Sequence, residues 1–153
     1  MKKLIIILAI VAVLFALFGV DNLIRDSYTL ELVSMEPQPA VADGNTPVQI
    51  AARLTRHGLP VQGHTLYILP QRGSFYSARV VTDENGMANF TYYPYLANSF
   101  IEAKPVSVEI YDEDNSIFIY VPVTLEFDIA LEQPKDEQDA SQTLTMDDIF
   151  GDD

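Results

Sequence analysis

An unbroken apolar segment from Leu4 to Val20 is the feature that most constrains what this chain can fold into. As a helix, this segment would extend about 26 Å, close to the ~30 Å thickness of a bilayer's hydrocarbon core. Lys2 and Lys3 precede it and Asp21 follows it. Positive charge before the segment predicts a cytoplasmic N-terminus and an extracytoplasmic remainder. We therefore predict a membrane anchor over residues 1–27. Its membrane-facing residues include Leu4, Ile7, Val11, Leu14 and Phe18.

Two other interpretations of this segment stay open. A cleaved signal peptide has the same charged start, but it ends in small residues before the cleavage site. Here the segment ends Phe15-Ala16-Leu17-Phe18-Gly19, which lacks that pattern. A buried core helix would need protein on all sides, because the segment has no polar stripe. The sequence favours a retained single-pass anchor, and either an anchor or a signal peptide would export the rest of the chain.

From residue 28 to residue 130 the apolar residues recur with a period of two. This pattern is typical of antiparallel strands with one buried and one solvated face. Turn residues interrupt the alternation about every ten positions, and roughly 100 residues in about seven strands is the size of an Ig-like β-sandwich. The fold class predicted is therefore all-β, an antiparallel Ig-like sandwich after one hydrophobic helix. The longest alternation, Ile117–Ile129, predicts one continuous final strand, with Pro122 at an edge or a bulge.

Four short motifs occur in a characteristic order between residues 43 and 88. They are Asp43-Gly44, Pro47-Val48-Gln49-Ile50, the Gly58–Gly63 segment GLPVQG and the Thr82–Ala88 segment TDENGMA. In this order they resemble the invasin/intimin type of bacterial Ig-like domain. The resemblance covers about residues 40–93, and it implies a surface-exposed sandwich used as a spacer or adhesive module without catalysis. Independently of any family, Asn85-Gly86 supplies the positive φ that a hairpin turn requires.

Composition argues against several functions. Acidic residues outnumber basic ones 22 to 9, giving a net charge of −13 that is unsuited to nucleic acid. The chain has no cysteine and only His57 and His64, so we expect no disulfide, no cofactor and no histidine-rich metal site. Its carboxylates gather in turns and the tail rather than in strand interiors, which disfavours an enzyme. The loop Asp112–Ser116 is rich in oxygen ligands, so calcium binding is an alternative to a solvated hairpin tip there.

Two segments are candidates for binding a protein partner. The first is a tyrosine-rich stretch, Tyr92, Tyr93 and Tyr95, which could expose an aromatic patch together with Phe100, Tyr111, Phe118 and Tyr120 or could pack over the sandwich itself. The second is the tail, residues 131–153, with eight acidic residues and one basic residue. We expect this tail to be disordered in isolation. Its apolar residues Leu144, Met146, Ile149 and Phe150 could form a docking peptide or could be incidental.

These features together predict a non-catalytic, membrane-anchored extracytoplasmic module. It would be a structural or protein-binding subunit of a cell-surface or envelope assembly, with an open oligomeric state. One alternative is a pilin-like filament subunit with the hydrophobic helix in the fibre core. Another is a secreted carbohydrate-binding accessory module that uses the tyrosine-rich surface.

Overall fold

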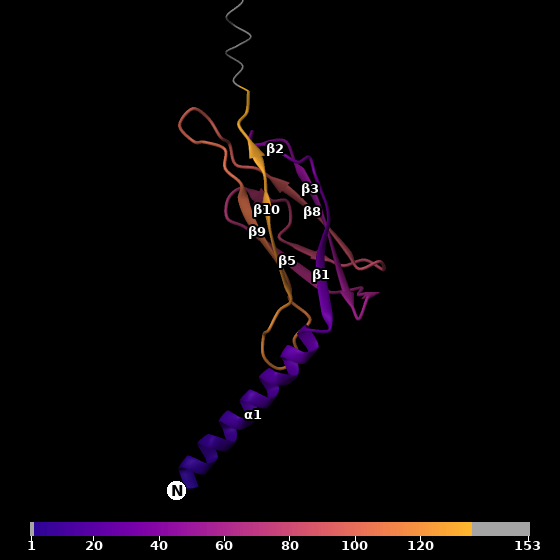
Figure 1. The fold of residues 1–153 in the computed structure, drawn as a ribbon, viewed down its shortest axis with the longest axis vertical. Coiled ribbons are helices and arrows are strands. Elements are labelled where there is room, and N and C mark those ends of the chain that lie inside the picture. The colour runs from indigo at the N-terminus through magenta and orange to yellow at the C-terminus, as the bar shows by residue number, and fades with distance from the viewer. Residues whose placement is uncertain (1, 136–153) are drawn as a thin grey trace, which may run out of the picture.

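The computed structural model describes residues 2–135, which form one long helix followed by a β-sandwich. Helix α1 spans Lys2–Arg25 and projects from one end of the sandwich (Figure 1). Only Asp26 and Ser27 separate it from the first strand. The apolar segment predicted to be helical therefore lies inside α1, and the sandwich is built from the residues after it.

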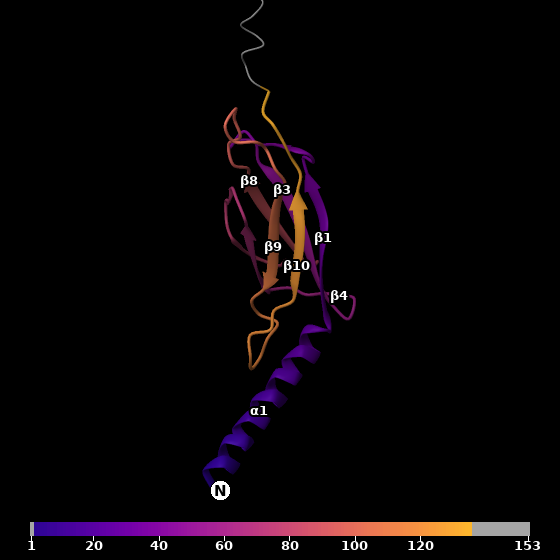
Figure 2. The same cartoon turned by 60° about the vertical axis from the view of Figure 1, so that its left-hand side comes forward.

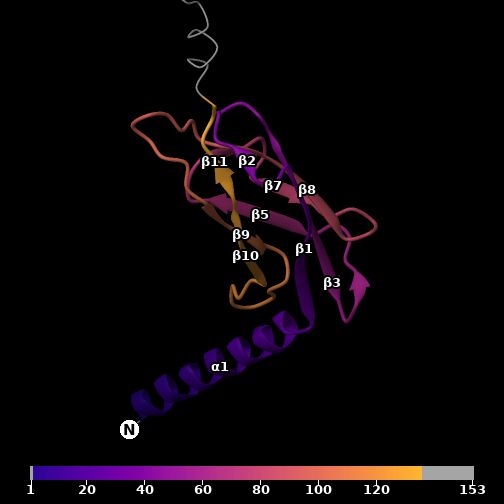
Figure 3. The same cartoon turned by 45° about the horizontal axis from the view of Figure 1, so that its top comes forward.

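Two antiparallel sheets form the sandwich, as the period of two predicts. The first sheet has the order β1-β3-β8-β6 with β4 beside β3: β1 Tyr28–Glu36, β3 Val48–Arg56, β8 Met87–Tyr93, β6 Ser74–Phe75 and β4 Leu59–Pro60. The second has the order β10-β9-β5-β7: β10 Thr124–Ile129, β9 Val106–Asp112, β5 Thr65–Pro70 and β7 Arg79–Val81. A short parallel pair joins β2 Ala40–Val41 to β11 Leu131–Glu132. Turned views show the sheets on either side of a shared interior (Figures 2 and 3).

The core lies between the facing sides of these sheets. Strand β3 contributes Ile50 and Leu54, β5 contributes Ile68, and β9 contributes Val108 and Ile110, all of them buried. Each is a member of an alternating apolar series, because successive side chains of a strand point to opposite faces. The Ig-like sandwich predicted from the sequence is confirmed.

The turn between β7 and β8 shows why two of the predicted motif residues are needed. Gly86 has a φ of +72°, and a Cβ at this position would overlap the carbonyl oxygen of Leu54. One carboxylate oxygen of Asp83 accepts hydrogen bonds from the backbone N–H groups of Asn85 and Met87, at 2.8 and 2.9 Å. A residue without a side chain and an acceptor three positions earlier together fix this turn.

The predicted continuous strand Ile117–Ile129 is wrong in its first half. Strand β10 begins only at Thr124, and residues 113–123 form a loop at the end of the sandwich that faces α1 (Figure 1). Alternation alone does not distinguish a strand from a loop whose backbone groups are bonded to side chains. Pro122 lies in this loop, two residues before β10, which is an edge strand of its sheet.

Candidate membrane-facing site

Helix α1 leaves its apolar side chains uncovered. The predicted anchor residues Leu4, Ile7, Val11, Leu14 and Phe18 are each between 41% and 61% exposed. Within residues 2–135, α1 is the one helix that is long and apolar enough to cross a membrane. Apolar surface is driven out of water at about 25 cal/mol per Å², so a helix that is apolar all round requires lipid or protein around it.

A buried carboxylate connects the end of α1 to the loop before β10. Asp21 is the buried residue of the helix, and its two oxygens accept hydrogen bonds from three successive backbone N–H groups. Ile117 and Phe118 donate at 2.9 Å, and Ile119 donates to the same oxygen as Phe118. A hydrogen bond to a charged group is stronger than a neutral one, and these three together hold the loop against the helix.

The loop is also held from within. The side-chain amide of buried Asn115 donates to the carbonyl oxygen of Val121 at 2.9 Å, and its oxygen accepts from the N–H of Val123 at 3.1 Å. The hydroxyl of Ser116 accepts from the N–H of Val121 at 2.8 Å. Side chains thus replace the ladder that a continuous strand would have made, and they give residues 115–123 a defined shape.

This shape points apolar side chains outward beside the helix. Ile117 is 68% exposed and Phe118 is 56% exposed, and Tyr120 is exposed as well. Ile119 lines an open apolar groove together with four residues of α1, which are Val11, Leu14, Phe15 and Phe18. We call the bonds from Asp21 to the N–H groups of residues 117–119 the clamp. Since Phe18 lies before Asp21 in the helix, the loop extends past this clamp toward the predicted membrane segment.

A second attachment lies at the start of β1. The carbonyl oxygen of Ser27 accepts a hydrogen bond from the N–H of His57 at 2.9 Å, and the hydroxyl of Ser27 accepts from Nε of Arg56 at 3.2 Å. The guanidinium of Arg56 also lies 5.1 Å from the centre of the Tyr28 ring. The junction between helix and sandwich is therefore bonded on two sides, by the β3–β4 turn and by the loop before β10.

The loop Asp112–Ser116 does not form the solvated hairpin tip favoured from the sequence. Asp112 is buried, and its Oδ2 lies 2.7 Å from Nδ1 of His64, while its Oδ1 accepts from the N–H of Asp114. Burial raises the pKa of the Asp112 carboxyl, and these two hydrogen bonds act in the opposite direction. Asp114 in turn accepts from the N–H of Thr65 at 2.6 Å. In the described residues no group of three or more His, Cys, Asp or Glu side chains is placed to hold a metal ion.

The predicted tyrosine surface needs a correction. Tyr92 belongs to the core, with its hydroxyl donating to the carbonyl oxygen of Arg72 at 2.9 Å, so it is not accessible to a partner. The hydroxyl of Tyr95 donates to the carbonyl of Glu102 at 3.1 Å and accepts from the N–H of Lys104 at 2.8 Å, which fixes the loop between β8 and β9. A role for Tyr93 and Tyr95 in binding stays a prediction.

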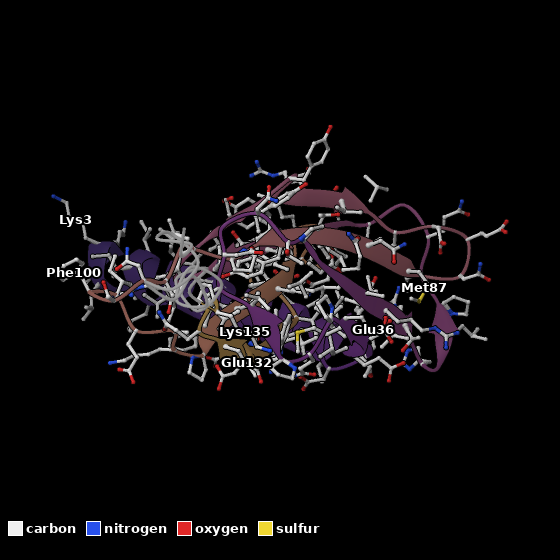
Figure 4. The ribbon with its side chains drawn as sticks, turned by 90° about the horizontal axis from the view of Figure 1, so that it is seen from above. Lys3, Glu36, Met87, Phe100, Glu132 and Lys135 are labelled. Carbon is white, nitrogen blue, oxygen red and sulfur yellow. The ribbon has the colours of Figure 1, made fainter. Side chains whose placement is uncertain are left out.

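The remaining aromatic residues of the predicted patch do not gather on one surface. Phe100 is 95% exposed and lies in the loop between β8 and β9, which is at the end of the sandwich opposite α1 (Figure 1). Seen from above, Phe100 is at the outer edge of the molecule (Figure 4). Phe118 and Tyr120 lie at the α1 end, where the Tyr120 ring packs edge-on against Tyr111 at 6.3 Å. The docking residues predicted in the tail, Leu144, Met146, Ile149 and Phe150, lie outside the described residues.

Two contacts of the site were missed by the sequence interpretation. Asp21 was read only as the end of the apolar segment, and His64 was assigned no partner. The groups they contact lie 96 to 98 and 48 residues away in the sequence. An available signal was the position of Asp21, a carboxylate that directly follows the apolar segment and still lies within α1.

No family model and no curated protein matches this chain. Among solved structures, it is similar to the C-terminal 282-residue fragment of intimin, in complex with the intimin-binding domain of the translocated intimin receptor. The TM-score is 0.50 and the identity 16%, over 66% of this chain and 33% of that fragment. A conjugative transposon lipoprotein from Bacteroides eggerthii aligns with a TM-score of 0.44 and 17% identity, over 67% of this chain and 96% of that one. The chain spans about a third of the intimin fragment it matches. The sandwich has the intimin/invasin type of bacterial Ig-like fold.

Proposed function

We propose that this chain is a single-pass, extracytoplasmic Ig-like module that presents its sandwich at a cell surface as a structural or protein-binding subunit. The observation that carries the proposal is α1, an apolar helix that the sandwich leaves uncovered. Lys2 and Lys3 at its start favour a cytoplasmic N-terminus. A non-catalytic role is supported by the polar groups of the site, since those of Asp21, Asn115 and Asp112 are engaged in structural hydrogen bonds.

The two alternatives have unequal support. A pilin-like filament would bury the same apolar helix in a fibre core, so the uncovered α1 supports it as well. The secreted carbohydrate-binding module loses support, because Tyr92 is in the core and the Tyr95 hydroxyl is bonded to the backbone of its own loop. Electron microscopy of the purified full chain distinguishes the single-pass module from the pilin-like filament, since fibres would be expected only for the filament.

Membrane extraction of the full chain tests the proposal. We expect the wild type to stay in the pellet after alkaline carbonate and to be released by detergent. The double variant Val11→Arg/Leu14→Arg should shift toward the carbonate supernatant, because each arginine near a span's centre costs about 2.5–3.5 kcal/mol. A matched variant with Leu59→Arg, at an exposed position in β4 of the sandwich, should behave as wild type.

Orientation and processing need two further measurements on the same material. Protease added outside intact spheroplasts should digest the sandwich, and N-terminal sequencing of the membrane-bound chain should find Leu4–Val20 retained. Release of the wild type by carbonate would contradict the anchor. A mature chain lacking the segment would indicate a cleaved signal peptide.

A further inference from the structure

The loop next to α1 has features that a solvated loop does not need. Residues 116–123 carry no charged side chain, although the chain as a whole has 31 charged residues. Three of the loop's large side chains, Ile117, Phe118 and Tyr120, are exposed on the α1 side of the sandwich. An exposed apolar cluster of this kind on a strongly acidic protein indicates a contact surface.

The position of the loop along the helix identifies what that surface contacts. Ile119 shares a groove with Leu14 and Phe18 of α1. At a rise of about 1.5 Å per residue, Phe18 lies about 4.5 Å and Leu14 about 10 Å before Asp21 along the helix axis. If α1 spans a bilayer, the loop therefore extends to a depth of about 5–10 Å, which is where interfacial apolar groups insert.

We propose that residues 117–120 form a second membrane contact, an apolar loop inserted into the outer interface of the lipid bilayer beside α1. This inference rests on the proposed anchor role of the helix and adds a lipid-binding surface on the sandwich itself. Asp21 positions the loop, since its carboxylate binds the three N–H groups at the base of the apolar cluster. Phe118 and Ile117 provide the apolar contact, and Tyr120 is the amphipathic ring typical of the interface.

Continuity with α1 favours lipid over another occupant. The groove under Ile119 is formed by side chains that must face lipid if the helix spans the membrane, so the same lipid layer reaches the loop. The sandwich carries a large excess of carboxylates and would be repelled by an anionic surface, whereas this uncharged loop would not.

Tryptophan fluorescence tests the insertion, because the natural chain has no tryptophan. The full chain carrying Phe118→Trp would be reconstituted in phosphatidylcholine vesicles that contain lipids with a quenching nitroxide either near the headgroup or deep in the acyl chain. Phe100→Trp, at the far end of the sandwich, is the matched aqueous control, and Phe18→Trp in α1 is the control for the span. Phe118 and Phe100 are both exposed, so circular dichroism should show a β-sandwich unchanged by either substitution.

We expect the emission of Phe118→Trp to shift to shorter wavelength and to be quenched by the headgroup-level nitroxide at least about twofold more than that of Phe100→Trp. If Phe18→Trp is quenched while Phe118→Trp emits as in water, the loop proposal is overturned and the anchor stands. A blue-shifted but unquenched Phe118→Trp would mean a protein occupant and would also overturn it. If neither nitroxide lipid quenches Phe18→Trp, α1 is not in the bilayer. The proposed anchor and the loop proposal are then both overturned.

Discussion

Replacing Asp21 by asparagine tests the clamp between helix and loop with the smallest change in shape. The carboxylate of Asp21 is buried and accepts hydrogen bonds from the N–H groups of Ile117, Phe118 and Ile119. Asparagine keeps one acceptor oxygen but places an NH₂ donor near at least one of these N–H donors. The substitution therefore removes the charge and at least one of the three bonds, and it leaves the size of the side chain unchanged.

The size of the effect follows from the kind of bond lost. A hydrogen bond to a charged group contributes about 1.5–3 kcal/mol, and a buried donor left unpaired costs about 1–3 kcal/mol. The loop can relax and let water reach the freed N–H groups, so the loss is smaller than the sum. We expect the free energy of local opening to fall by about 2–4 kcal/mol. Since 1.4 kcal/mol is a factor of ten, amide exchange in the loop should accelerate by about 30-fold to about 1,000-fold.

Hydrogen–deuterium exchange of the full chain in lipid nanodiscs measures this opening. The peptide that contains residues 117–119 should lose its protection in Asp21→Asn, while peptides from β3 and β9 should exchange as in the wild type, because the core does not depend on the clamp. Asp26→Asn is the matched control, since Asp26 is at the same helix end and, within residues 2–135, its side chain bonds only to neighbouring Arg25. Equal exchange of the loop peptide in the two variants would refute the reasoning.

Two predictions concern the stability of the sandwich, measured by thermal or chemical unfolding in detergent. Gly86→Ala should cost about 3 kcal/mol and Gly58→Ala about 1 kcal/mol, because both strain a positive φ but only Gly86 also meets the Leu54 carbonyl. Tyr92→Phe should cost about 1 kcal/mol at neutral pH through the lost bond to Arg72. Burial raises the pKa of Tyr92 from 10.0 to about 12, so the unfolded chain releases this proton first. Wild-type stability should therefore fall between pH 10 and pH 12, and less so in the variant.

Much of the fold could be predicted because it rests on short-range patterns. The hydrophobic segment, the period of two and the Asn85-Gly86 turn each express a local geometric requirement. Strand β3 shows this clearly, since its alternating residues Val48, Ile50, Ala52 and Leu54 are all buried. Where one face of a sheet packs on a core, the sequence of each strand records which face that is.

The site itself could not be predicted, because it depends on contacts between distant residues. The alternation from Ile117 onward is that of a strand, but the side chains of Asp21, Asn115 and Ser116 occupy backbone groups that a neighbouring strand would have paired. The sequence does not determine whether Tyr92 is buried or exposed, because a tyrosine near a strand end is suited both to a core and to an exposed patch. A hydrogen bond spanning 48 residues, as between His64 and Asp112, leaves no trace in local periodicity.

The contacts at the α1 end of the sandwich also determine how the sandwich is oriented relative to the helix. Two residues separate α1 from β1, and the junction is bonded by Asp21 on one side and by Ser27 on the other. A linker this short, bonded on both sides, leaves the sandwich little freedom to pivot on the helix. If the loop before β10 also lies in lipid, the sandwich meets the membrane at two places, which fixes its tilt as well as its height. The loop carrying Phe100 then lies at the end of the sandwich away from the membrane, with its ring 95% exposed.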